Sequence, residues 1–412
     1  MTERYIDLLD PELIKDPFTG YGRLRDLEGL AKGGVNGVSP MWLATRYDDV
    51  RTVLGDPRFV VDSGLVPGSD GARPDVVDQL RVAAGIPEEY LPYLSTGIAD
   101  VEGQSHARLR SLVSKAFTAG RVAALRPRIE RITDDLLADM ARAEGAVDLL
   151  AAFAYPLPIA VICELVGIPE SERPSWRAWS AALATGAGPG MGEAVKGMAD
   201  HAKELIARRR SGAGDDLVST LSRKVDGDRL SETELVTLIL NLVVAGHETT
   251  ANLIANGVIA LLTHPWQLEL LKSRPELLPS AVTELMRWCG PSLGSLVRYA
   301  VEDVELGGSL VRAGEPVLPV LAAANHDPAV FAGAGKLDIT RQPRSGRTHV
   351  GFGHGPHYCL GALLAKQEAE VAFGALLREF PALRLAVDPA ELRHGPNPGT
   401  WHFAEVPLLL NW

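Results

Sequence analysis

Cysteine is scarce in this sequence, because the 412 residues contain only three, Cys163, Cys289 and Cys359. Their odd number and wide spacing exclude a disulfide framework and a zinc site built from paired cysteines. The sequence therefore predicts a protein of a reducing compartment, and we expect it in the cytoplasm.

Long hydrophobic runs are absent as well. The longest, residues 235–245, is interrupted by Thr237 and Asn241 and is much shorter than the about 20 residues that a membrane helix needs. The first ten residues carry charges and lack the apolar core of a signal peptide. We therefore expect neither export nor a membrane anchor, and we interpret residues 235–245 as part of a buried helix.

Positive charge is in deficit, with 41 Lys and Arg against 52 Asp and Glu and a net charge of -11. Such a surface repels phosphates on average, which argues against nucleic acid as a partner. Apolar residues make up 46% of the chain, enough to bury a large core. Nothing marks a domain boundary, so we expect a single domain over residues 1–412.

Periodicity predicts a mainly α fold with a minor β portion. Helical patterns dominate residues 103–290 and return at 360–379, whereas short β-type runs lie near 35–65, 295–320 and 383–410. Ser231 and Glu234 form a capping-box pattern that opens a helix of about thirty residues ending near Thr263. Glycines and prolines predict a long loop over residues 63–96 and a hinge between two helices at 186–192.

One cysteine stands in an unusual context. Residues 351–361 read GFGHGPHYCLG, and three glycines in five residues permit a tight loop that approaches a bulky flat group closely. Cys359 then precedes a helix, where backbone N–H groups and the helix dipole favour the thiolate. A thiolate is a good ligand for iron and favours O–O bond cleavage. Cys163 and Cys289 lie in apolar helices, and we interpret them as inert packing residues.

A second segment, AGHETT at residues 245–250, lies in the middle of the long predicted helix. Gly246 costs the helix up to ~1 kcal/mol, so we expect another group to fill the space of its missing side chain. Ala245 and Gly246 share a helix face with Thr249, and Glu248 stands about a quarter-turn away. We interpret His247 as a structural residue on the far side of the helix.

These two segments resemble the cysteine loop and the oxygen-binding groove of the cytochrome P450 family. The resemblance implies the triangular, mainly helical fold of that family, with haem b between the two segments and Cys359 as the axial iron ligand. It places Phe352, Gly353, Ala245 and Gly246 against the haem. It further implies that Thr249 hydrogen-bonds dioxygen at the iron while Glu248 relays protons to it.

The same resemblance gives roles to charged residues elsewhere. Glu284 and Arg287 match the Glu-x-x-Arg element, with Arg341 as the third member of a structural triad that fixes the cysteine loop. Leu337 stands where an aromatic residue is common in the family. The expected partners of the haem propionates are His106, Arg110, Arg298 and His357.

The partners follow from the chain length and from charge. No residues remain for a fused flavin or nicotinamide domain, so we expect electrons from NAD(P)H to arrive through a separate ferredoxin reductase and ferredoxin. A basic cluster of Arg341, Arg344 and Arg347, with Lys366 nearby, is either a solvated face or a dock for that acidic partner. We expect a monomer.

The resemblance implies a monooxygenase, a hydroxylase or epoxidase, that inserts one atom of O2 into an organic molecule. Its pocket is expected to use residues 63–96, 179–191 and 293–296, and the mainly apolar side chains predict a lipophilic substrate. A macrolide or other polyketide is the first hypothesis, a steroid or terpenoid the second. An oxidase that couples aromatic rings and a non-catalytic haem sensor remain as alternatives. The individual pocket residues are Leu240, Val244, Leu293, Leu296 and Trp401.

Overall fold

In the computed structural model of the chain, the longest helix is α12 (Glu232–Thr263), and its sequence determines both of its ends. The Ser231 hydroxyl accepts the Glu234 N–H at 3.1 Å, and the Glu234 carboxylate accepts the Ser231 N–H at 2.7 Å. This confirms the capping box. The helix ends at His264, because that residue precedes Pro265 and is disfavoured in a helical conformation.

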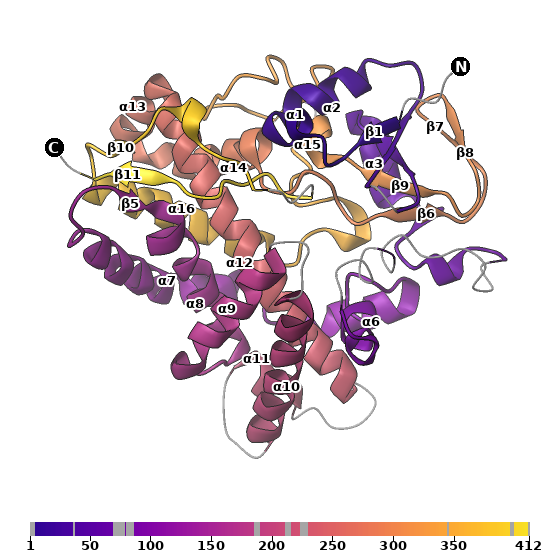
Figure 1. The fold of residues 1–412 in the computed structure, drawn as a ribbon, viewed down its shortest axis with the longest axis horizontal. Coiled ribbons are helices and arrows are strands. Elements are labelled where there is room, and N and C mark those ends of the chain that lie inside the picture. Colours follow the sequence, from indigo (N-terminus) through magenta and orange to yellow (C-terminus); the bar gives the residue numbers. More distant parts are fainter. Residues whose placement is uncertain are drawn as a thin grey trace.

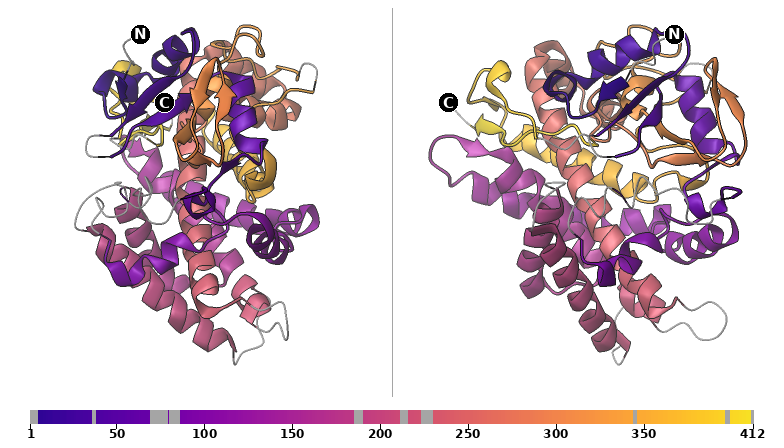
Figure 2. Two further views of the ribbon diagram at one scale, coloured as in Figure 1. Left: turned by 90° about the vertical axis from the view of Figure 1, so that its right-hand side faces the viewer. Right: turned by 45° about the vertical axis from the view of Figure 1, so that its right-hand side comes forward.

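Helix α12 runs through the middle of the molecule (Figures 1 and 2). It is packed against α8 (Pro156–Val166), α10 (Gly190–Arg210), α14 (Leu278–Cys289) and α16 (Ala362–Glu379). Among the described residues it is the one helix long and apolar enough to cross a membrane, but 61% of its most apolar window is buried in the protein. It is therefore a core helix, as the sequence predicts.

The structure describes residues 5–35, 38–68, 79, 86–184, 190–210, 216–222, 230–343, 346–395 and 399–410. It is 58% helix and 10% strand, which confirms a mainly α fold with minor β. The outline in Figure 1 is roughly triangular, with α10 and α11 at the lower corner. The remaining α-helices are α1 (Pro11–Lys15), α2 (Pro17–Arg25), α3 (Tyr47–Gly55), α5 (Pro92–Ser95), α6 (Gly103–Ser114), α7 (Ala119–Met140), α9 (Arg173–Ala184), α11 (Leu217–Ser222), α13 (Pro265–Ser273) and α15 (Leu321–Asn325).

Single turns of other helix types join these elements. A π-helical turn, η3 (Leu150–Ala154), leads through Tyr155 into α8. Turns of 3-10 helix are η1 (Ser63–Leu65), η2 (Glu88–Tyr90), η4 (Glu170–Glu172), η5 (Pro275–Leu277), η6 (Gly355–His357) and η7 (Pro389–Glu391). The predicted loop over 63–96 thus contains η1, η2 and α5, while residues 69–78 and 80–85 lie outside the described residues, as do 185–189 of the predicted hinge.

The β portion comes from both ends of the chain. A six-stranded sheet has the order β1-β2-β3-β9-β6-β4, and a two-stranded hairpin pairs β7 with β8. The six-stranded sheet lies beside the N-terminal helices (Figure 1). The strands of these two sheets are β1 (Tyr5–Asp7), β2 (Ala31–Gly34), β3 (Met41–Ala44), β4 (Phe59–Val60), β6 (Arg298–Ala300), β7 (Val304–Leu306), β8 (Ser309–Val311) and β9 (Pro316–Pro319).

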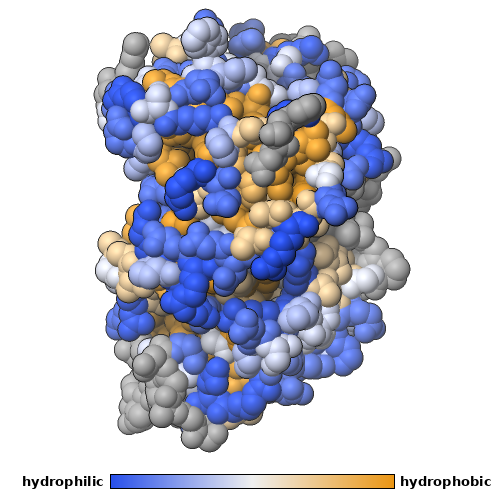
Figure 3. Space-filling view, turned by 90° about the vertical axis from the view of Figure 1, so that its left-hand side faces the viewer, coloured by the Kyte–Doolittle hydropathy of each residue, from blue (hydrophilic) through white to orange (hydrophobic). Residues whose placement is uncertain are grey.

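A third sheet contains a strand that the sequence does not indicate. Strand β5 (Val147–Asp148) lies within the mainly helical region and pairs with β11 (Pro407–Leu409), which also pairs with β10 (Arg384–Leu385). Two residues are too short for an alternating pattern, so only the contact with the C-terminal strand reveals β5. Figure 3 shows the face on the side of this sheet, where hydrophilic residues dominate and hydrophobic ones gather in the upper part.

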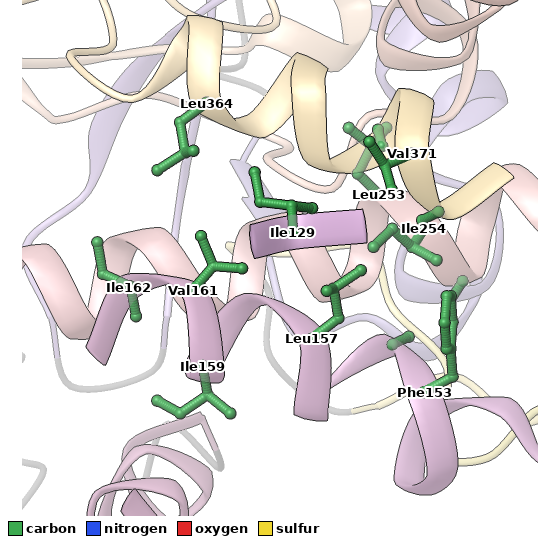
Figure 4. Close-up of a cluster of buried hydrophobic side chains, with 14 of the residues drawn as sticks. Ile129, Phe153, Leu157, Ile159, Val161, Ile162, Leu253, Ile254, Leu364 and Val371 are labelled. Carbon is green, nitrogen blue, oxygen red and sulfur yellow. The ribbon is translucent and has the colours of Figure 1, made fainter. Parts of the chain in front are cut away.

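The main core lies where α7, α8, α12 and α16 meet (Figure 4). Ile129 of α7, Leu157 of α8 and Ile254 of α12 are each fully buried there. The Phe373 ring of α16 packs directly against Gly257 of α12. A Cβ added to Gly257 would lie 2.4 Å from that ring. This core fixes α12 relative to α16, the helix that follows Cys359.

Candidate active site

The cysteine loop is held by its own backbone. The N–H of Gly353 donates to the carbonyl of Val350, and the N–H of Cys359 donates to the carbonyl of Phe352, both at 2.8 Å. Gly353 and Gly355 have φ angles of +75° and +72°, which side-chain-bearing residues rarely adopt. A Cβ on Gly355 would also lie 2.5 Å from the Leu54 carbonyl oxygen. Glycine therefore allows the loop to pack directly on α3.

Cys359 differs from the other two cysteines, because it is exposed and they are buried. Protein atoms still crowd its sulfur, and this burial raises the pKa of the thiol. The backbone N–H of Gly361, the charge of Arg110 and the N–H of Ala362 lower that pKa. These three groups are the ones that would stabilise a thiolate. Burial also raises the pKa of Cys163, to about 12, as expected for an inert thiol.

Three side chains of basic residues, His106, His357 and Arg298, gather beside the loop. The rings of His106 and His357 lie 4.2 Å apart, and the positive charge of Arg298 acts on His106. Burial lowers the pKa of Arg298 to about 10, and it also lowers the pKa of His106. Arg298 Nη2 and His106 Nε2 are buried without a hydrogen-bond partner among the described residues. The structure thus brings together three of the four predicted propionate partners.

Arg110 and Glu102 complete this cluster. Arg110 Nη2 donates to the carbonyl of Tyr358 at 2.6 Å, so the fourth predicted residue binds the cysteine loop itself. Glu102 was not predicted. Its Oε1 lies 3.2 Å from His357 Nε2, close enough for an ion pair although not aligned for a hydrogen bond. A lone acid at a helix N-terminus carries no sequence signal for this contact.

Helix α12 shows accessible surface where the second segment lies. Ala245 is exposed and Val244 and Thr249 are partly exposed, although the helix around them is largely buried. The Thr249 hydroxyl donates to the carbonyl of Ala245 at 2.7 Å. Ile162 of α8 fills the space beside Gly246, 3.2 Å from where a Cβ would lie. The expectation that another group occupies this space is thus met by helix packing.

Glu248 and His247 both turn toward the protein interior. Burial raises the pKa of Glu248, so its carboxyl holds a proton more firmly than usual. His247 is 1% exposed, and burial lowers its pKa to about 4. Both ring nitrogens of His247 and Oε1 of Glu248 lack hydrogen-bond partners among the described residues.

The predicted triad forms a buried ion cluster. Arg287 binds both carboxylate oxygens of Glu284 at 2.7 and 2.8 Å, and Arg341 Nε lies 3.0 Å from the same two oxygens. Arg287 also donates to the carbonyl of Asn325, whose side chain accepts the Val350 N–H at 2.7 Å. Asn325, which no sequence signal identifies, connects the triad to the cysteine loop.

Two arginines of the basic cluster form ion pairs within the protein. Arg341 shares the Glu284 carboxylate with Arg287, and Arg347 forms an ion pair with Asp48 at 3.2 Å. Arg341 is thus part of the structural triad, whereas Arg347 is 40% exposed in a surface ion pair, so a dock at Arg347 stays a prediction. Lys366 lies over the Phe352 ring at 5.5 Å. Arg344 lies outside the described residues.

The predicted substrate contacts differ in accessibility. Leu240 and Leu293 are buried, whereas Val244 is partly exposed and Leu296 is 42% exposed. The Trp401 ring packs edge-on against Phe18, with centroids 4.9 Å apart, and stacks on His394. Val244, Leu296 and the partly exposed Trp401 therefore offer the accessible apolar surface of this set.

Comparison with known proteins gives consistent matches. The family model described as Cytochrome P450 matches residues 177–391. The chain is 42% identical to Cytochrome P450 107B1 of Saccharopolyspora erythraea, covering 94% of each chain, and 42% identical to the mycinamicin IV hydroxylase/epoxidase of Micromonospora griseorubida, covering 90% of each. The solved structure of the tirandamycin C-bound P450 monooxygenase TamI superposes with a TM-score of 0.88 at 39% identity, covering 98% of this chain and 100% of that one.

Proposed function

The chain belongs to the cytochrome P450 family, and on that premise we propose that it inserts one atom of O2 into a macrolide or other polyketide natural product with electrons from a ferredoxin. It is a haem-dependent monooxygenase, as are the relatives that it matches over nearly its whole length. The observation that carries the proposal is Cys359, an exposed residue held by backbone hydrogen bonds at the end of a loop that requires glycine.

Haem fits the residues around this thiol. Its iron needs a protein ligand, which the Cys359 thiolate would supply, and its propionates need cationic or hydrogen-bonding partners. The buried, unpartnered atoms Arg298 Nη2 and His106 Nε2 suit two such carboxylates, together with His357 and Arg110. Phe352, Gly353, Ala245 and Gly246 would line the haem site. When bound, haem supplies the reductive activation of O2 and the transfer of one oxygen atom.

Two residues of α12 would transfer protons in the site. Burial raises the pKa of the Glu248 carboxyl, which favours its protonated form, and Glu248 would release a proton during turnover as a general acid. The Thr249 hydroxyl, already oriented by the Ala245 carbonyl, would accept and pass it. If Thr249→Ala left both turnover and peroxide leakage unchanged, this assignment would be wrong.

The substrate class is supported by accessibility and by the relatives. Val244 and Leu296 offer apolar surface, which suits a lipophilic molecule. Relatives of similar identity include a 6-deoxyerythronolide B hydroxylase, 40% identical over 93% of this chain, besides the mycinamicin enzyme. We therefore propose a polyketide as the substrate in preference to a steroid or terpenoid.

Electrons would come from NAD(P)H through a reductase and a ferredoxin. Leu363 and Tyr358, on either side of Cys359 in sequence, are 49% and 40% exposed, and the Arg110 cation lies beside Tyr358. An apolar centre with a nearby cation suits docking of an acidic protein. We propose that the enzyme acts as a monomer in the cytoplasm.

One experiment tests the reaction and its alternatives. The haem-loaded protein is titrated with macrolides, steroids and terpenoids while the Soret band is followed, and bound compounds are turned over with ferredoxin, reductase, NADPH and labelled O2. We expect a polyketide to bind and its product to gain one labelled oxygen atom. A product that has lost hydrogens without gaining oxygen would indicate a coupling oxidase. Binding without any product would indicate a haem sensor.

A further inference from the structure

Asn256 lies on α12 and binds two segments that are far apart in the sequence. Its amide Nδ2 donates to the carbonyl of Cys289, the last residue of α14, at 3.1 Å and to the carbonyl of Trp401 at 2.9 Å. Both acceptors are carbonyls, so only the amide nitrogen can bind them and the side chain has one orientation. Asn256 therefore ties the end of α14 to α12, together with the C-terminal segment, yellow in Figure 1, that crosses α12 here.

The two segments are also paired with each other. The N–H of Trp401 donates to the carbonyl of Pro291 at 2.7 Å, and the N–H of Leu293 donates to the carbonyl of Gly399 at 3.1 Å. An antiparallel bridge lies between these two hydrogen bonds. Asn256 holds this ladder at one end, next to the bond between Trp401 and Pro291. We call residues 291–293 and 399–401 the paired segments.

The paired segments carry predicted substrate contacts. Leu293 and Trp401 belong to them, and Leu296 follows the first segment closely. Leu293 is buried, whereas Trp401 is partly exposed and Leu296 is 42% exposed. Thr249, which is proposed to pass protons during turnover, lies seven residues before Asn256, close to two turns of helix. The two residues therefore share one face of α12, about 10 Å apart along its axis.

Ring packing alone does not fix the paired segments relative to α12. The aromatic partners of the Trp401 ring, with centroids 4.9 to 5.5 Å away, are Phe18, His394 and Phe403. None of these three residues belongs to α12. The hydrogen bonds from Asn256 are directional, so they determine where along α12 the carbonyl of Trp401 lies.

An asparagine at this position is costly for packing alone. Asn256 is 1% exposed, and its Oδ1 is buried without a hydrogen-bond partner among the described residues. An unsatisfied buried acceptor lowers the free energy of unfolding. The two hydrogen bonds that the amide donates are therefore what suits an asparagine to this place, because an apolar side chain could make neither of them.

We propose that Asn256 is a positioning residue for substrate specificity, because its amide sets the place of the paired segments relative to Thr249. This inference rests on the proposed function, in which those segments form part of the substrate pocket. A fixed pocket wall leaves one part of a lipophilic substrate within reach of the reacting oxygen, whereas a wall that shifts along α12 presents other carbon atoms. Asn256 acts through the paired segments and takes no part in the chemical step.

Three variants of the haem-loaded enzyme test the proposal. Asn256→Leu keeps a branched side chain but removes both donated hydrogen bonds, and Asn256→Ser keeps one hydroxyl proton, which can bind only one of the two carbonyls. Asn252→Leu is the matched control, since Asn252 is a fully buried asparagine one turn earlier whose Oδ1 lies 3.5 Å from the Tyr155 hydroxyl. The probe is the macrolide that gives the largest Soret shift with the wild type. For each variant we would measure its Kd, the ratio of oxidation products and the crystal structure.

We expect Asn256→Leu to raise the Kd of the macrolide about tenfold and to spread oxidation over more than one carbon atom, because the pocket wall is no longer fixed. Asn256→Ser should lie between this variant and the wild type. Asn252→Leu should match the wild type in Kd and product ratio, although it also loses a buried amide. In the crystal structure of Asn256→Leu, the paired segments should be displaced relative to α12.

Several outcomes would overturn the proposal. A wild-type Kd and product ratio in Asn256→Leu would do so, as would equal changes in Asn252→Leu. If Asn256→Leu does not fold, a wild-type Kd and product ratio in Asn256→Ser would be sufficient against it. A wild-type enzyme that neither binds nor oxidises a macrolide would contradict the proposed function instead. The crystal structures would then decide the inference, which fails if the paired segments of Asn256→Leu keep their place on α12.

Discussion

The Asn325 side chain accepts the backbone N–H of Val350 at 2.7 Å, and both groups are buried. The Asn325 carbonyl in turn accepts a hydrogen bond from Arg287 at 2.8 Å, and the Val350 carbonyl accepts the N–H of Gly353. One residue therefore links the buried ion triad to the loop that presents Cys359.

Asn325→Ala should loosen that loop. The Val350 N–H would remain buried without a partner, which costs about 1–3 kcal/mol of unfolding free energy. Haem should also dissociate faster, because the loop loses its anchor. Urea unfolding and the rate of haem transfer to a scavenger protein measure the two effects. Gln342→Ala, which removes an exposed amide, serves as the control and should change neither. Equal haem release in both variants would contradict the link.

Gly355→Ala should destabilise the protein by at least about 1–2 kcal/mol, because alanine resists the φ angle of +72°. Its Cβ would also meet the Leu54 carbonyl oxygen at 2.5 Å, so α3 or the loop must shift. Gly120→Ala is the matched control, since nothing lies within 4 Å of its Cβ and it stands in α7. That change should stabilise the helix by up to about 1 kcal/mol. Thermal unfolding compares the two, and similar melting temperatures would refute the packing argument.

Glu284→Gln should be far more damaging than the loss of a surface acid. It leaves two arginines without their shared carboxylate in a buried site, at a cost of about 3–5 kcal/mol. Glu130→Gln removes an exposed partner of Arg126 and should cost at most about 1 kcal/mol. Chemical denaturation measures both free energies. A small loss for Glu284→Gln would mean that the triad does not hold the structure together.

Stability should fall on mild acidification. Burial lowers the pKa of His247 and of His326 to about 4, and that of His349 to about 3. Between pH 6.5 and these values the unfolded chain binds protons that the folded protein does not. The free energy of unfolding therefore keeps the full contribution of these histidines above about pH 6.5. As the pH falls below that value, each histidine lowers the free energy of unfolding by roughly 1.4 kcal/mol per pH unit.

Urea unfolding at about pH 7.5 and about pH 5 measures this decline. His326→Phe removes one of the three groups, so its stability should depend less steeply on pH than that of the wild type. A pH dependence as steep as the wild type's would show that folding does not lower the pKa of His326.

The sequence was most informative where local chemistry determines structure. The capping box and Pro265 delimit α12, and the glycines of the cysteine loop are required by its backbone angles. Contacts between distant residues gave no such signal. Asn325 binds a backbone group 25 residues away, and Val147 forms β5 only because it meets Leu408. The sequence also could not show that Arg341 and Arg347 form ion pairs with Glu284 and Asp48.

The most direct test of the account is the absorption spectrum of the reduced, carbon monoxide-bound protein, recorded for the wild type and for Cys359→His. Thiolate ligation shifts the Soret band to longer wavelength than histidine ligation does, because the thiolate donates electron density to the iron. We predict the red-shifted band for the wild type and its loss in Cys359→His, with Cys163→Ser retaining it. A wild-type protein that binds no haem, or whose band already lies at the histidine position, would contradict the assignment of Cys359 as the iron ligand.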